Sequence, residues 1–213
     1  MITNAQLRLT LAAIRNVLRA KGVEDILANI GKKELRIEEL PDDKQPALNI
    51  IDYAAIFTYI DTKNPSAHDR LMDKPGKNSL QLIGRAYFQE ILRQKNTLTG
   101  FSKVLMGLWT EEKRIKFVLE SIRDVQKKLV PQSELILEEE NGVFVINDYN
   151  CLVCMGQHGT TYPICEFTVG LLQESVAWAT GINFTIEETH CRAREDNCCR
   201  FTISRFPTKA SSN

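Results

Sequence analysis

The chain has 213 residues, 27 of them basic and 27 acidic, so its formal net charge at neutral pH is zero. This balance gives no electrostatic indication of binding to nucleic acid or to anionic membranes. Hydrophobic residues make up 43% of the chain, enough for a sizeable core. No apolar run of about 18 residues occurs, and the N-terminus lacks a signal-peptide pattern. We therefore expect a cytoplasmic protein that is neither an integral membrane protein nor a nucleic-acid binder.

The first half of the chain has helical periodicity. Apolar side chains recur on one face of a predicted amphipathic helix at Leu7, Leu11, Ile14 and Leu18. A second short helix is predicted over 23–30, ended by Gly31. Residues 46–61 are apolar on most sides and predict a buried helix, and the polar stretch 62–78 predicts a loop.

Three more helices are predicted before residue 131. The first covers 79–94 and the second covers 101–108. Thr110 can cap the third, because its side-chain oxygen accepts a hydrogen bond from the first turn. That helix runs through Leu129 and is stopped by Pro131.

The second half of the chain changes to strands. Residues 134–140 and 143–149 predict a hairpin around Asn141-Gly142. A helix is predicted over 162–180, and strands over 183–190 and 198–206. The expected fold is therefore α+β, with a helical N-terminal half followed by β-β-α-β-β and an antiparallel sheet. Region 1–130 and module 131–206 are expected to form one compact domain with a flexible tail at 207–213.

The cysteines are clustered in sequence, because all six lie in the last third of the chain. In a reducing cytosol such clustering favours metal binding over disulfides. The alternative is that they are buried as small hydrophobic residues. The six are Cys151, Cys154, Cys165, Cys191, Cys198 and Cys199.

Four residues are candidate ligands of one zinc ion, which takes about four thiolate, imidazole or carboxylate ligands. Cys191 and Cys199 flank a polar loop that is suited to holding a metal ion. Glu188 lies three positions before Cys191. Cys165 begins the predicted helix, where the helix dipole lowers a thiol pKa and favours the thiolate.

Strand alternation supports two of these ligands. Glu188 lies on the same face as the apolar Ile186, where a carboxylate is costly unless it is paired or coordinated. Cys199 shares the core face with Phe201, whereas Cys198 shares the solvent face, so Cys199 is preferred. Cys151 and Cys154 form a lone C-x-x-C, interpreted as incidental buried cysteine with half a metal site as the alternative.

These residues resemble the 4-vinyl reductase domain family, which also forms the sensor part of phenol-responsive activators. The spacing of Cys165, Glu188, Cys191 and Cys199 matches the zinc site of the phenol sensors, and Gly170 and Phe201 agree with the family pattern. The family commonly has glycine where this chain has Glu195. The His and Trp with which the phenol sensors hold the phenol hydroxyl have no counterpart here.

The resemblance implies a function. Four protein ligands leave no open coordination position, so the zinc is expected to be structural. The resemblance indicates a binding module for an apolar or aromatic small molecule, with a tetrapyrrole or chlorophyll precursor as leading candidate, acting as carrier, sensor or pigment-protein assembly factor. Residues expected to line its pocket, with plain core packing as the alternative, are Phe101, Leu105, Trp109 and Phe117.

Two other functions remain open at this point. The expected fold is similar to that of TRAPP vesicle-tethering subunits, which indicates a dimeric scaffold without a functional ligand. A homodimer is expected under both readings. An enzyme is not favoured, because the sequence has no nicotinamide, flavin or phosphate-binding motif.

Overall fold

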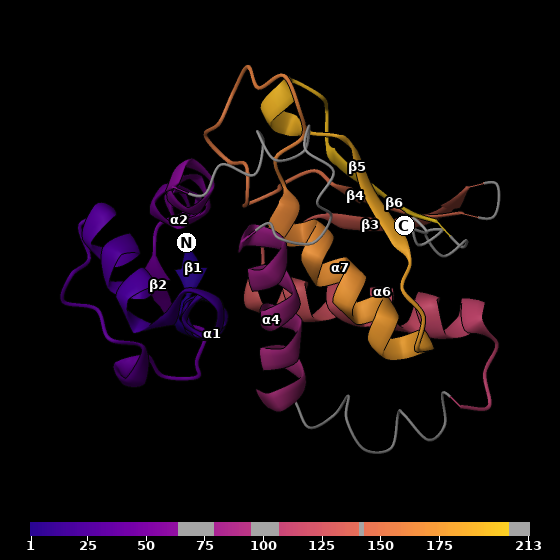
Figure 1. Cartoon of the computed structure of the whole chain (residues 1–213), viewed down its shortest axis with the longest axis horizontal. Helices are drawn as coiled ribbons and strands as arrows, with labels where there is room; N and C mark the ends of the chain where they lie inside the picture. Colours follow the sequence, from indigo (N-terminus) through magenta and orange to yellow (C-terminus); the bar gives the residue numbers. More distant parts are fainter. Residues whose placement is uncertain (64–78, 95–106, 141–142, 205–213) are drawn as a thin grey trace, which may run out of the picture.

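A computed structural model describes residues 1–63, 79–94, 107–140 and 143–204. It contains helices and antiparallel sheets, so the predicted α+β class is confirmed. Figure 1 shows the N-terminal elements as one group, with α4 between them and the elements of the C-terminal half. Among the described residues, no helix is both long and apolar enough to cross a bilayer.

The N-terminal group is built on a short sheet and two helices. Strand β1 (Ile2–Thr3) pairs antiparallel with β2 (Pro46–Leu48). Helix α1 (Asn4–Asn29) begins where the Thr3 side chain accepts a hydrogen bond from the Gln6 amide. The remaining elements of this group are the short helix η1 (Ile37–Glu39) and α2 (Ile50–Lys63).

Two predictions for this group can be compared with the structure. The two helices predicted around 7–18 and over 23–30 are both present, as segments of α1 separated by a kink at Arg19, whose φ is 64°. The helix predicted over 46–61 is wrong at its start, because residues 46–48 pair with the N-terminus as β2. The predicted helix at 101–108 lies largely outside the described residues, as do the tail at 207–213 and most of the loop at 62–78.

Helices α4 (Ser79–Gln94) and α6 (Glu111–Leu129) have the predicted bounds. The predicted cap of α6 is confirmed, because the Thr110 side chain accepts a hydrogen bond from the Lys113 amide. Glu111 and Glu112 lie in its first turn and lysines in its last, as the helix dipole favours.

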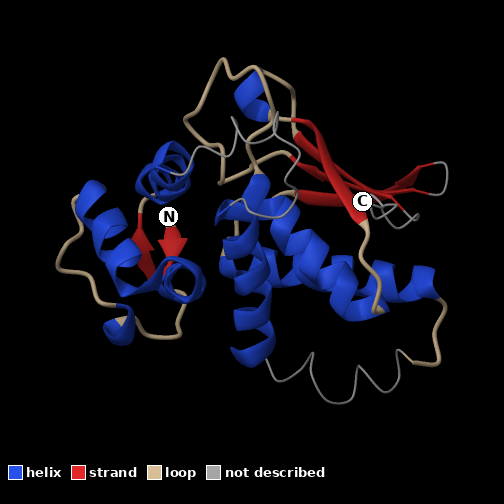
Figure 2. Cartoon of the chain, viewed as in Figure 1, coloured by secondary structure: helices blue, strands red, loops and turns tan. Residues whose placement is uncertain are grey.

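The C-terminal half carries a four-stranded antiparallel sheet in the order β3-β4-β6-β5. Figure 2 shows it beside α6 and α7. Its register pairs Asp148 at the end of β4 with Cys199 at the start of β6. The elements of this half are β3 (Leu135–Glu140), β4 (Val143–Asp148), α7 (Glu166–Thr180), β5 (Thr185–His190), η3 (Arg192–Arg194) and β6 (Cys199–Ser204).

Helices α4 and α7 touch backbone to backbone where they cross. A Cβ atom on Gly170 would lie only 2.1 Å from the Gln81 carbonyl oxygen, so glycine is needed for this approach. The Gln81 and Arg85 side chains donate hydrogen bonds to Glu166 and Gln173 across the same contact. The contact fixes the beginning of α7, the helix that follows Cys165. One hydrophobic core contains residues from β1 through β6.

Candidate functional site

Five of the six cysteines converge with Glu188 at one end of the four-stranded sheet. Two overlapping groups each place four ligand atoms within 4.8 Å of one another. All five cysteine side chains are buried. The first group is Cys151, Cys154, Cys165 and Cys199, and the second is Cys165, Glu188, Cys191 and Cys199.

Three chain segments bring these residues together. Cys165 immediately precedes α7, in the N-cap position, where its side chain makes no capping hydrogen bond. Cys191 and Cys199 lie at the two ends of the β5–β6 connection that contains η3. Cys151 and Cys154 follow β4, whose last residue is paired with Cys199. The Thr160 amide donates to the Ala193 carbonyl at 3.0 Å, which joins the connection after β4 to η3.

The sulfur atoms are spaced as the corners of a tetrahedral metal site. The Sγ atom of Cys165 lies 3.5 Å from that of Cys151, 3.9 Å from that of Cys191 and 3.7 Å from that of Cys199. The Cys154 and Cys199 sulfurs are 3.4 Å apart. In a tetrahedral site with metal–sulfur bonds of about 2.3 Å, the sulfur atoms lie about 3.8 Å from one another. A metal ion therefore fits between these sulfurs with little rearrangement.

Glu188 adds a carboxylate that is only partly satisfied. Its Oε2 atom accepts a hydrogen bond from the Cys165 amide at 2.7 Å. Its Oε1 atom is buried and has no hydrogen-bond partner among the described residues. Burial and the neighbouring Cys191 together raise the pKa of Glu188 to about 9. A cation beside Oε1 would supply the missing partner and stabilise the ionised carboxylate.

The pKa values of the cysteine thiols in this cluster are shifted in different directions. Contacts with Cys154, Cys165 and Cys199 lower the pKa of Cys151 well below its ordinary value. Burial raises the pKa of Cys165 well above that value. The Arg192 amide donates to the Cys199 sulfur at 3.4 Å. Several thiolates buried together would need positive charge beside them, and a cation between these sulfurs could supply it.

The structure brings together all four residues that the sequence indicated as metal ligands. The predicted strand alternation is confirmed, because Cys199 is buried and Cys198 points to the other face, towards Asn147. The expected break between Glu188 and Cys191 is also present, as a register irregularity between Glu188 and His190. One detail of the prediction was wrong, since Cys165 precedes the first turn of α7 instead of lying within it.

The interpretation of Cys151 and Cys154 as incidental cysteines missed their position. Both are buried, as that interpretation required, but they lie within ligand distance of Cys165 and Cys199. The C-x-x-C spacing was the signal that could have found them. Their place beside Cys199 depends on the pairing of β4 with β6, which a lone spacing does not reveal.

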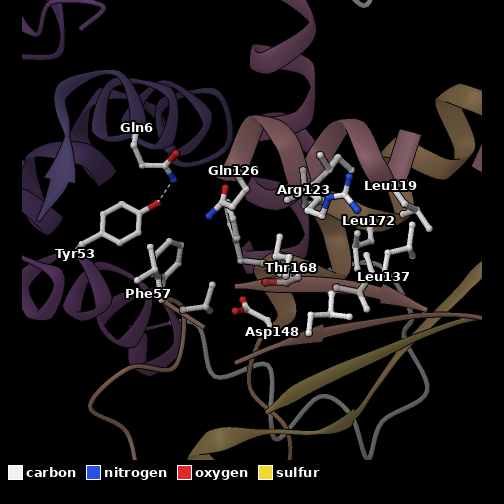
Figure 3. Close-up of a pocket in the computed structure, with 18 residues that line it drawn as sticks. Gln6, Tyr53, Phe57, Leu119, Arg123, Gln126, Leu137, Asp148, Thr168 and Leu172 are labelled. Carbon is white, nitrogen blue, oxygen red and sulfur yellow. Dashed lines mark hydrogen bonds between the residues drawn. The ribbon is translucent and has the colours of Figure 1, made fainter. Parts of the chain in front are cut away.

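A separate pocket lies between α1, α2, α6, α7 and the β3–β4 hairpin (Figure 3). Its cavity volume is about 50 Å³, and the polar side chains that line it are those of Gln6, Tyr53, Arg123, Gln126, Asp148 and Thr168. The predicted pocket residues lie elsewhere or cannot be placed. The rings of Trp109 and Phe117 pack against each other at 5.4 Å and do not line this pocket. The other two, Phe101 and Leu105, lie outside the described residues.

No model of a protein family matches the sequence, and no curated protein matches it. Solved structures of similar fold are H-NOX domains. One is described as an oxygen-binding H-NOX domain related to soluble guanylate cyclases, with TM-score 0.57, 11% identity, and 92% of this chain and 90% of that chain covered. Another is an H-NOX protein from S. oneidensis in the Fe(II)NO ligation state, with TM-score 0.55, 9% identity and coverage of 92% and 97%. A third, from work on H-NOX activation, has TM-score 0.57, 13% identity and coverage of 95% and 94%.

The chain has the H-NOX fold. The resemblances to 4-vinyl reductase domains and to TRAPP subunits were therefore wrong, because the structures that match over nearly the whole chain belong to neither group. The two functions inferred from these resemblances, a module for chlorophyll precursors and a tethering scaffold, were therefore wrong as well. The homodimer stays a prediction.

The structural zinc cofactor is corrected as well. It rested on one closed set of four ligands, selected from their positions in the sequence and supported by the family resemblance. Solved structures of the H-NOX fold are described with heme, and the cluster in this chain offers two overlapping sets of ligands. The four predicted ligand residues remain candidates for a metal whose identity the sequence does not specify.

The H-NOX fold raises the expectation of heme, which needs a large apolar pocket and an axial ligand. The pocket in Figure 3 holds about 50 Å³, far less than the roughly 300–1,000 Å³ of ligand sites. None of the described residues lining it is a histidine, cysteine or methionine. Its tyrosine, Tyr53, is engaged by Gln6 and Thr10 through its hydroxyl. A wider groove beside α1, of about 420 Å³, has charged walls and likewise no such ligand among its described residues. Neither of these two pockets, as the described residues line it, fits heme.

Proposed function

We propose that this chain is a sensory domain of the H-NOX fold in which a thiolate-bound metal ion is the responsive group. The observation that carries this proposal is the convergence of buried cysteine sulfurs on the unpartnered Oε1 atom of Glu188. Similar structures are described as an oxygen-binding domain and as an Fe(II)NO complex. Ligand recognition at a buried metal is thus compatible with this fold, and the cluster supplies a different place for the metal.

The ligands of this metal are Cys165, Glu188, Cys191 and Cys199. Three thiolates and one carboxylate favour a thiophilic divalent ion. These ligands carry four negative charges, and a divalent ion offsets two of them. The amides of Cys165 and Arg192 donate to Glu188 and to the Cys199 sulfur, and so stabilise part of the remaining charge.

The position of Cys165 gives the centre a way to influence the rest of the domain. Cys165 is followed directly by α7, and α7 packs on α4 through the backbone contact at Gly170. Helix α4 in turn joins the N-terminal group, where Tyr87 donates to the Gln6 side chain of α1 at 2.7 Å. Gain or loss of the metal would move the beginning of α7, and the rigid helix contact would carry that movement to α4.

The test measures metal and heme in the full chain, purified under reducing conditions without chelator. We expect at least one equivalent of a transition metal by elemental analysis and no heme absorbance. Cys165→Ser and Cys199→Ser should lose the metal. Cys198→Ser is the matched control, because its sulfur points away from the cluster, and it should retain the metal.

Two results would overturn the proposal. One is stoichiometric heme with a cluster that takes up no metal. The other is metal-free protein that also fails to bind added Co²⁺ when its thiols are reduced. A sensory role further requires that hydrogen exchange in α7 and α4 differ between metal-loaded and stripped protein. Equal exchange in the two states would leave a metal site without a sensory function.

A further inference from the structure

The two groups of ligands share one edge. Cys165 and Cys199 belong to both groups, and their sulfur atoms lie 3.7 Å apart. Cys151 and Cys154 complete one group of four ligands around this edge, and Glu188 and Cys191 complete the other. Two groups of four ligands that share an edge match the arrangement of two metal ions bridged by two thiolates.

We infer that the centre binds two thiophilic divalent ions, with Cys165 and Cys199 as bridging ligands, an inference that rests on the proposed function. The first ion has four sulfur ligands, and the second has three sulfurs and the Glu188 carboxylate. Thiolate sulfur is suited to bridging because it has more than one lone pair to donate. The separation of 3.7 Å between the bridging sulfurs is close to the tetrahedral edge of about 3.8 Å that each ion requires.

Charge supports the second ion. One divalent ion bound by three thiolates and one carboxylate, from Cys165, Glu188, Cys191 and Cys199, gives the centre a net charge of −2. A second divalent ion bound by the thiolates of Cys151 and Cys154 adds two positive charges and two negative charges. The two added negative charges balance the added metal, so the net charge of the buried centre stays at −2. The second ion therefore adds no uncompensated charge to the interior.

Each half of the centre is also held by its own contacts. The Cys154 and Cys199 sulfurs are 3.4 Å apart, and the Cys151 and Cys165 sulfurs are 3.5 Å apart, so both members of the C-x-x-C reach the shared edge. On the other side, the Cys191 amide donates to the Asp196 carboxylate at 2.8 Å, which closes the turn that presents Cys191. An incidental pair of buried cysteines would have no reason to contact both bridging sulfurs.

The experiment titrates reduced, metal-stripped full-length protein with Co²⁺ in the absence of oxygen. Absorbance from sulfur-to-cobalt charge transfer counts the bound ions, and electron paramagnetic resonance reports whether they are bridged. We expect two equivalents per chain. The resonance signal should rise during the first equivalent and fall during the second, because bridging sulfur couples the unpaired electrons of the two ions.

Variants separate the two halves of the centre. The double variant Cys151→Ser/Cys154→Ser should bind one equivalent and show no loss of signal, and Cys191→Ser should also lose one equivalent. The control Cys198→Ser should bind two. The wild-type titration by itself keeps the inference testable if a variant does not fold.

The outcomes distinguish this inference from the proposed function. One equivalent in both the wild type and the double variant overturns the dinuclear centre and leaves the proposed function standing. Two equivalents whose resonance signals simply add overturn the bridge. Absence of any binding overturns both proposals.

Discussion

A Cβ atom on Gly84 of α4 would lie 2.0 Å from the carbonyl oxygen of Phe167 on α7. Because the obstructing atom belongs to the backbone, it cannot move without shifting a helix. Gly84→Ala should therefore lower the free energy of unfolding by about 3 kcal/mol, despite the higher helix propensity of alanine. Urea denaturation measures this change. Leu82→Ala, on the exposed side of the same helix, is the control and should cost less than about 1 kcal/mol. Equal effects of the two substitutions would show that the close helix contact is absent.

The turn between β5 and β6 contains a residue in an unfavourable conformation. Glu195 has a φ of 69°, in the left-handed region that non-glycine residues avoid. Glu195→Gly should raise the free energy of unfolding by about 0.5–1 kcal/mol, because relief of the strain exceeds the extra entropy of the unfolded chain. Glu195→Ala removes the same charge without relieving the strain and should not stabilise the protein. If both substitutions stabilise equally in thermal denaturation, charge is the cause and the strain argument fails.

The sequence predicted those elements whose signals are local. Helix α6 was found because Thr110 caps it and one apolar stripe runs along it, and both features lie within the helix itself. The faces of β6 were found from alternation, because Cys199 is buried in the strand and the preceding Cys198 points to the other face. Strand β1 has two residues and β2 has three, and more than 40 positions of the sequence separate them. No short sequence pattern indicates that they pair.

The site was predicted to a similar extent and for the same reason. Cys165, Glu188, Cys191 and Cys199 could be selected from spacing and strand alternation. The C-x-x-C spacing made Cys151 a possible ligand, but its place in the cluster depends on the register that pairs Asp148 with Cys199. The family was misidentified from four residues, whereas the fold is a property of the whole chain and is shared with H-NOX domains at about one residue in ten.

Removal of the metal tests the coupling between the centre and the fold. A metal ion held by Cys165 and Cys199 would join the start of α7 to the start of β6. The free energy of metal binding then contributes to the free energy of folding. A strong chelator should lower the melting temperature of the wild type by at least about 5 °C. The same chelator should leave the melting temperature of Cys165→Ser unchanged, because that variant has no metal to lose. A chelator effect of equal size in both proteins would have to come from another site and would contradict this coupling.

Two buried tyrosines predict how stability changes at high pH. Burial raises the pKa of Tyr53 to about 12 and that of Tyr87 well above its ordinary value. The unfolded chain titrates its tyrosines near pH 10, so above about pH 10 the unfolded state has lost protons that the folded state still holds. This contribution to stability is complete below about pH 10 and is lost as the pH rises through 12. The free energy of unfolding, measured in urea, should therefore fall steadily over this range.

The variant Tyr53→Phe separates this titration from general alkaline damage. The Tyr53 hydroxyl accepts from the Gln6 amide at 2.8 Å and contacts Thr10, so its loss leaves a buried Gln6 donor without a partner. The variant should lose about 1–3 kcal/mol at neutral pH. Above about pH 10 its stability should fall less steeply than that of the wild type, because one of the two groups that titrate differently has been removed. Tyr162→Phe, at an exposed position, is the control and should reproduce the wild-type slope. Parallel curves for Tyr53→Phe and the wild type would mean that Tyr53 does not hold its proton more tightly in the folded state.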